Sequence, residues 1–130
     1  MANSRYNKDK HIRIFYLLSA RDENGFKVTI KKYIHPITGF LWAYVRDLSQ
    51  KEVQARKQVQ NDATIQVRIN RREITNDMFM EYKRPGMKNT NTYNISGIDF
   101  FDDSQSEIKF DGSLISQAIT YDRVEGTDWK

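Results

Sequence analysis

The chain has 130 residues, which is enough for one modest hydrophobic core but not for two. It contains no cysteine, which excludes a disulfide framework, a thiolate metal site and a cysteine nucleophile and fits a reducing compartment. The net charge of +4 comes from interspersed basic and acidic residues, so contact with nucleic acid is possible but not required.

The N-terminal segment "MANSRYNKDK" is polar and lacks the apolar core of a signal peptide. No apolar run in the sequence approaches the roughly 20 residues that a membrane-spanning helix needs. We therefore expect a soluble, unexported protein with no membrane partner. Residues 1–9 are interpreted as an N-terminal arm.

Residues 10–46 predict three antiparallel strands. Alternation of side chains in "KHIRIFYLLS" and "FKVTIKKYI" predicts the first two, and Asn24-Gly25 between them predicts a hairpin turn. The segment "HPITG" then interrupts the pattern, because proline cannot donate to a strand ladder and glycine permits a turn. The third strand is "FLWAYVR", with Trp42 and Tyr44 expected on its core side.

A short helix is predicted after the third strand. Ser49 and Glu52 have the spacing of a capping box, in which each residue's side chain binds the other's backbone N–H. Good helix formers without glycine or proline continue to about Gln60. The apolar stripe of this helix is narrow, so we expect it to dock on one side and not to form part of the central core. The stripe consists of Val53, Ala55 and Val59.

Four further strands complete the prediction. The segment "ATIQVRINR" alternates almost without fault, as a half-buried strand does. "DMFMEYK", "TYNISGIDF" and "EIKFDG" predict three more strands, and Gly97 inside one of them indicates a bulge. The whole order predicts a mainly β fold, a small antiparallel β-barrel of about seven short strands with one α-helix inserted between central strands.

This barrel is expected to span residues 10–115 as a single domain. Residues 116–130 have no sustained period, and we interpret them as a C-terminal tail whose order depends on assembly. Trp129 in this tail is a candidate anchor for a partner.

No group of residues in the sequence predicts catalysis. His11 lies in a strand and His35 lies beside Pro36, and neither has an acid or a nucleophile at a recognisable spacing. The pair Asp102-Asp103 lacks the alternating ligands and the glycine of a calcium loop. We therefore predict no enzyme activity, no metal and no cofactor. A small histidine-based hydrolase is the weakest of the alternatives that stay open.

A stronger alternative is a barrel-type module that binds single-stranded nucleic acid. Small barrels can present aromatic residues and a basic groove to a single strand. Strands also need aromatic residues for ordinary packing, so the pattern by itself does not decide. The interleaved aromatic and basic residues are Arg5, Tyr6, Arg13, Phe15, Lys31, Lys32, Tyr33, Phe40, Trp42, Tyr44 and Arg46.

Five short motifs occur in a fixed order along the chain. They are "HIRI" at 11–14, "DENG" at 22–25, "WAYVRDLSQKE" at 42–52, "ATIQVRINRREIT" at 63–75 and "YNISGID" at 93–99. As an ordered set they resemble the head-tail joining proteins of long-tailed double-stranded DNA phages, also called head-closure, head-completion or stopper proteins. The first ten residues and the tail from about Ser116 lie outside the pattern, and the loop "KRPGMKNTN" is longer than is usual in that family.

The resemblance implies a non-enzymatic structural protein of the virion's head-tail connector, assembled in the host cytoplasm. In that family a homo-oligomeric ring lies below the portal or its adaptor and closes the DNA channel after packaging. The ring offers its other side to the tail terminator or tail tube protein.

By position, the channel plug of such a ring corresponds to residues 47–62. The candidate plug residues are Ser49, Lys51, Glu52, Arg56 and Lys57. The basic side chains among them are expected to contact the phosphates of packaged DNA without reading its sequence. Arg84 and Trp129 are the candidate contacts within the ring or with a partner.

Overall fold

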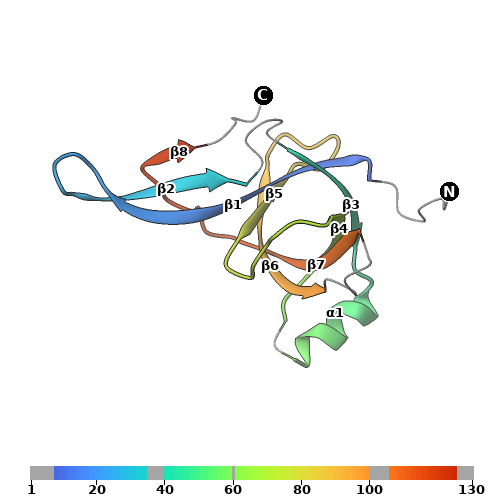
Figure 1. Ribbon diagram of the computed structural model, residues 1–130. Helices are drawn as coiled ribbons and strands as arrows, with labels where there is room; N and C mark the ends of the chain where they lie inside the picture. The colour runs from blue at the N-terminus through green and yellow to red at the C-terminus, as the bar shows by residue number, and fades with distance from the viewer. Residues whose placement is uncertain (1–7, 35–39, 60, 100–105, 126–130) are drawn as a thin grey trace.

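The computed structural model of the protein describes residues 8–34, 40–59, 61–99 and 106–125. Eight strands and one helix lie in this part of the chain (Figure 1). In chain order they are β1 (Lys10–Arg21), β2 (Lys27–Tyr33), β3 (Leu41–Asp47), α1 (Gln50–Lys57), β4 (Ile65–Asn70), β5 (Phe79–Tyr82), β6 (Asn91–Asp99), β7 (Glu107–Leu114) and β8 (Arg123–Glu125).

Six of the strands close into a barrel in the order β3-β4-β7-β6-β5-β1, because β1 also pairs with β3. Every pairing around this barrel is antiparallel. The predicted small antiparallel β-barrel with one α-helix is therefore confirmed. The remaining two strands, β2 and β8, extend the sheet outside the barrel.

Strand β1 belongs both to the barrel and to a hairpin outside it. Its first half pairs with β3 at Lys10–Ile12 and with β5 at Ile12–Phe15, whereas Phe15–Arg21 pair with β2. The outer half of β1 thus leaves the barrel as a projecting β1–β2 hairpin, on the left of Figure 1. The hairpin turn confirms the Asn24-Gly25 prediction, and the Asp22 carboxylate accepts the backbone N–H of Asn24 in it.

Strand β8 was not predicted. It pairs in parallel with Ile30–Lys32 of β2 and lies within the segment 116–130, where the sequence shows no period. A strand of three residues is too short for alternation to reveal, so its position comes from pairing with a distant strand.

The core fills the barrel with one alternate set of side chains from each strand. The strand predicted at residues 63–71 is confirmed in this respect, because its four apolar positions are completely or almost completely buried. The core cluster consists of Ile12, Ile14, Leu41, Ala43, Ile65, Val67, Ile69, Ile74, Met80, Tyr82, Tyr93, Ile95, Ile108 and Phe110.

The core side of β3 differs from the sequence prediction. Leu41 and Ala43 point into the core, whereas Trp42 is 53% exposed and Tyr44 is half-buried. Both alternating sets of side chains in this strand are apolar, so the period alone does not determine which set faces inward. The small Ala43 takes the interior position, and Trp42 lies on the outer surface.

The bulge predicted at Gly97 is confirmed. Its φ is 58°, and the pairing of β6 with β7 shifts register between Ser96 and Asp99. A residue with a side chain rarely adopts this left-handed conformation, which explains the glycine at this position.

Several residues named in the sequence predictions lie outside the described ranges. They are Arg5, Tyr6, His35, Pro36, Gln60, Asp102, Asp103 and Trp129. Within those ranges, no helix has both the length and the apolar character that crossing a membrane requires.

Candidate functional site

Helix α1 lies outside the barrel, on the connection between the neighbouring strands β3 and β4 (Figure 1). Two backbone hydrogen bonds hold the base of this connection. Leu48 N–H donates to the Thr64 carbonyl, and Thr64 N–H donates to the Gly112 carbonyl, each at 2.9 Å. Leu48 is also buried, so the connection has a fixed root on the barrel.

The first turn of α1 forms the predicted capping box. Ser49 Oγ accepts the Glu52 N–H at 3.2 Å, and Glu52 Oε1 accepts the Ser49 N–H at 2.9 Å. Arg46 of β3 binds both oxygens of the Glu52 carboxylate, at 2.9 and 2.7 Å. The hydrogen bonds from Arg46, followed by the bond from the Ser49 backbone, hold the pKa of Glu52 well below its usual range.

The last turn of α1 is tied to β7, which is separated from β3 by the single strand β4. Arg56 Nε donates to Asp111 Oδ2 of β7 at 2.8 Å. Asn61 Nδ2 lies 3.4 Å from the same oxygen, and its own Oδ1 accepts the Ala63 N–H. Asp111 is only 7% exposed, so this is a charged contact in a mostly dry position.

Apolar packing contributes little to the position of α1. None of its eight residues is buried, and the following Val59 is 75% exposed. The prediction of a helix that cannot be part of the central core is therefore confirmed. Two polar tethers, Glu52 to Arg46 and Arg56 to Asp111, attach it to the barrel.

The five candidate plug residues have different surroundings. Ser49, Glu52 and Arg56 take part in the tethers described above, and Arg56 is therefore locally neutralised by Asp111. Lys51 and Lys57 are exposed and form no ion pair with the described residues. The structure thus leaves two of the three predicted cations available to an external anion.

Arg84, a candidate partner contact, binds within the chain. Its guanidinium forms an ion pair with Asp47 at the end of β3, directly before the α1 connection. The hydrogen bond that Arg84 donates to Asp47 raises the pKa of Arg84. The other candidate contact, Trp129, lies outside the described residues.

A small aromatic cluster lies where the start of β1 pairs with the start of β3. The His11 ring stacks on Phe40 and meets the edge of Trp42, with centroids 4.1 Å apart in both pairs. Four of the other predicted base-binding residues are unavailable, because Arg13, Phe15, Lys31 and Tyr33 are buried. This outcome corrects the idea of a continuous aromatic and basic surface, and it leaves the smaller cluster around Trp42.

The sequence also did not predict a buried charged group formed by side chains of β2 and β5. Lys31 Nζ lies 2.6 Å from Glu81 Oε2, and Tyr33 Oη donates to Glu81 Oε1 at 2.8 Å. Burial lowers the pKa of Lys31, but the bonds to Glu81 and Tyr33 outweigh it and raise that pKa overall. Burial raises the pKa of Tyr33. In the sequence Lys31 occupies the polar side of an amphipathic strand, which gave no sign of its burial.

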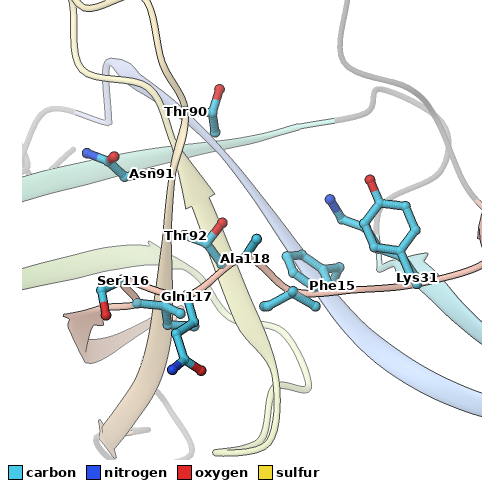
Figure 2. A pocket seen from close by; sticks show the side chains of 11 residues that line it. Phe15, Lys31, Thr90, Asn91, Thr92, Ser116, Gln117 and Ala118 are labelled. Atoms are coloured by element: carbon cyan, nitrogen blue, oxygen red, sulfur yellow. The ribbon is translucent and has the colours of Figure 1, made fainter.

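A cleft of about 370 Å³ opens beside this charged group. Figure 2 shows Phe15 and Lys31 on one side of it, Thr90, Asn91 and Thr92 on a second, and Ser116, Gln117 and Ala118 on the segment that crosses over them. The Lys31 ammonium is already satisfied by Glu81, so the cleft presents mainly neutral polar groups. Among the described residues no cluster of histidine and carboxylate side chains could hold a metal ion.

Comparison with known proteins finds a similar fold. Neither a protein-family model nor a curated protein matches the sequence. The solution structure of protein SF1141 from Shigella flexneri 2a is similar, with a TM-score of 0.68 over 89% of this chain and 100% of that chain. The two sequences are 19% identical, so the similarity establishes a shared fold alone.

Proposed function

We propose that the protein is a non-enzymatic structural component of a phage head-tail connector. In this proposal a ring of copies lies below the portal or its adaptor, closes the DNA channel after packaging and offers its other side to the tail. The observation that carries the proposal is helix α1, which stands outside the barrel without a buried residue and is attached by two polar tethers. The ordered motifs that resemble those of head-tail joining proteins support the same function.

The geometry of α1 suits an element that faces a DNA channel. In a closed ring, one segment of every copy is placed around the axis, so the charge of each segment is multiplied by the number of copies. Lys51 and Lys57 are exposed, and together they would form a cationic collar for the phosphates of packaged DNA. Contact with phosphates is independent of sequence, as a channel for a whole genome requires.

The polar tethers also suit this function, because they hold α1 without embedding it. Breaking a tether exposes charged groups to water that can solvate them, whereas removing a core element exposes a large apolar surface. We therefore assign α1 and its flanks, residues 47–62, to the channel side of the ring.

The first experiment locates the chain in an intact particle by mass spectrometry and cryo-electron microscopy. We expect several symmetry-related copies at the head-tail junction. The second experiment deletes residues 49–60 and joins their flanks with a short glycine-serine linker. We expect heads that lose DNA and fail to mature. Deleted particles that retain DNA and accept tails would refute the plug assignment.

Charge reversal tests the collar separately from the presence of the helix. The variant K51E/K57E should retain the fold and reduce DNA retention in filled heads. The matched control K83E/K88E makes the same charge change at two exposed lysines outside α1 and should retain DNA normally. Equal loss in both variants would mean that total charge, and not the position of α1, is responsible.

The cluster of His11, Phe40 and Trp42, in which His11 and Trp42 are exposed, favours a second candidate function, binding of single-stranded nucleic acid. Bases stack on exposed aromatic side chains, and the stacking would quench Trp42 fluorescence. A salt-sensitive quench on titration with an oligonucleotide, lost in Trp42→Ala, is the expected result of this function. Lack of any binding at low salt would exclude it.

A further inference from the structure

Outside the barrel, three strand segments form a ribbon with two open edges. The ribbon consists of the outer half of β1 (Tyr16–Arg21), β2 and β8, in that order. Strand β5 pairs with β1 only as far as Phe15, so the remaining edge of β1 has no strand partner in the described part of the chain. Strand β8 likewise pairs with β2 alone there. Such edges carry unpaired backbone N–H and C=O groups that can bind another strand.

The two open edges lie level with each other across the ribbon. Leu17 pairs with Lys31, and Lys31 pairs with Val124, so these three residues form one row. Leu18, Ile30 and Arg123 form the next row in the same way. Residues in one row project from the same face of the sheet. Each row therefore runs across the ribbon from the β1 edge to the β8 edge.

The β1 edge has none of the usual protection against strand pairing. Natural edges are commonly blocked by charged residues, proline or a bulge. Residues 16–20 are "YLLSA", without a charge or a proline, and Leu17 and Leu18 are 36% and 39% exposed. The first charge on this edge is Arg21, at the end of the strand. An uncharged and partly apolar edge of this kind is suited to pairing.

We propose that the β8 edge of one copy pairs antiparallel with the β1 edge of the next copy, so that the ribbons join into one sheet between subunits. The partner is a second copy because the ribbon's own register fits it. Repeating the rows places Val124 opposite Leu17 of the next copy, an apolar pair on one face. Arg123 then meets Leu18, and Glu125 meets Tyr16, so no like charges face each other across the new pairing.

The contact joins two different edges and is therefore heterologous. Repeated contacts of this type generate a closed ring when the rotation between copies closes, and an open filament otherwise. The ring symmetry of this inference rests on the proposed connector function, whereas the edge pairing itself rests on the two open strands. The pairing is short, so the contact between two copies is weak, and a ring gains stability from closure.

Cysteine cross-linking tests the pairing in the full chain, which has no native cysteine. The variant L17C/V124C places one thiol on each edge of the ribbon. Within one copy these positions are two strand spacings apart, about 9.5 Å, which is beyond the reach of a disulfide. Under mild oxidation of the concentrated protein we expect a ladder of disulfide-linked dimers and higher oligomers. Mixing L17C with V124C should give a heterodimer and nothing larger.

The matched control is L18C/V124C, in which the first thiol moves by one residue to the opposite face. This variant should lose the ladder, and circular dichroism should show that both double variants retain the barrel. No ladder in L17C/V124C, or equal ladders in the two variants, would refute the pairing. Efficient dimers of L17C alone would show a symmetric contact between two β1 edges, which also contradicts it.

The outcome is separable from that of the proposed function. Multiple copies at the head-tail junction combined with no ladder would mean that another surface forms the ring. A ladder combined with absence of the chain from particles would keep the edge pairing and refute the connector function.

Discussion

Arg56 of α1 binds Asp111 of β7 across 55 residues of sequence, with Arg56 Nε 2.8 Å from Asp111 Oδ2. The bulge in β6 makes room for this contact. A Cβ atom at Gly97 would lie 3.3 Å from Asp111 Oδ2, closer than most side-chain contacts. Glycine at the bulge therefore lets the carboxylate lie against the sheet and hold the helix.

Replacing Arg56 with glutamine should loosen α1. The substitution leaves the mostly buried Asp111 carboxylate with only its long contact to Asn61. The loss of a hydrogen bond to a charged group costs about 1–3 kcal/mol, seen as a lower free energy of unfolding in urea. Amide exchange in residues 50–57 should accelerate as well. The neighbouring Lys57→Gln removes an exposed charge and should change neither measurement. Equal effects of the two variants would contradict a specific tether.

The capping box makes a separate contribution to the same helix. Ser49→Ala removes the oxygen that accepts the Glu52 N–H and should destabilise α1 by about 0.5–2 kcal/mol. Ser49→Asp restores an acceptor and should recover most of the loss. Hydrogen exchange of the first turn is the measurement, because the helix contributes no buried residue to the core. Slow exchange in Ser49→Ala would show that the Arg46 contact suffices by itself.

Glu52 should make α1 sensitive to acid. Its pKa is lowered in the folded state, mainly by Arg46, so its stabilising effect is complete above the ordinary carboxyl pKa of about 4.3. The effect declines as pH falls below that value toward the lower folded pKa. Glu52→Gln lacks this titration, so the difference in α1 exchange between the two proteins should be largest near neutrality and shrink in acid. A difference that stays constant between neutrality and pH 3 would contradict a lowered pKa of Glu52 in the folded state.

The sequence predicted most of the fold because the barrel strands follow simple alternation. Ile65, Val67 and Ile69 were predicted on one face and are all buried. The helix start was also predictable, since a capping box is a local pattern that depends on Ser49 and Glu52 alone. The bulge at Gly97 was predicted on the same local basis.

The features that the sequence did not predict depend on contacts between distant segments, or on a strand whose alternation does not show which side faces the core. Trp42 was placed on the wrong side because both sets of residues in its strand are apolar. Lys31 is buried and pairs with Glu81 of β5, a contact between distant segments that no local pattern records. The contact between Arg56 and Asp111 is also long-range. Neither of the two tethers of α1 was therefore predicted from the sequence, which indicated only its capping box.

The buried pair of Lys31 and Glu81 should be costly to break. Their side chains are 9% and 13% exposed, so Glu81→Gln leaves a buried ammonium without its counter-charge. We expect a loss of about 3 kcal/mol in the free energy of unfolding. The double variant K31M/E81Q removes both charges and should recover part of that loss. Additive effects of the two substitutions in a double-mutant cycle would show that the pair is not coupled.

The same group predicts a loss of stability in alkali. The pKa values of Lys31 and Tyr33 are both raised in the folded protein. The stabilisation that they provide is thus complete below their unfolded pKa values, near pH 10, and is lost as pH rises through the folded values. Urea unfolding from pH 8 to pH 11.5 should show a steeper decline for the natural protein than for K31M/Y33F. Parallel curves would contradict the prediction.

Gly112 of β7 lies against the buried side chain of Ile65. A Cβ atom there would lie 2.8 Å from Ile65 Cγ1 and 3.0 Å from Ile65 Cδ1, so the neighbouring side chain would have to move. Overpacking of this kind costs about 1–3 kcal/mol, and Gly112→Ala should lower the free energy of unfolding by that amount. The adjacent Ser113→Ala adds no atom and should stay within about 0.5 kcal/mol of the natural protein.

A double-mutant cycle identifies the atoms responsible for the Gly112 effect. Ile65→Ala alone should cost about 2–5 kcal/mol through the cavity that it creates. In the Gly112→Ala background it should cost less, because the added methyl group fills part of that cavity and the clash is gone. The effect should also reach α1, since the Gly112 carbonyl accepts the Thr64 N–H at the root of the helix connection. Faster exchange of the Thr64 amide in Gly112→Ala would confirm this link, and unchanged exchange with additive stabilities would refute it.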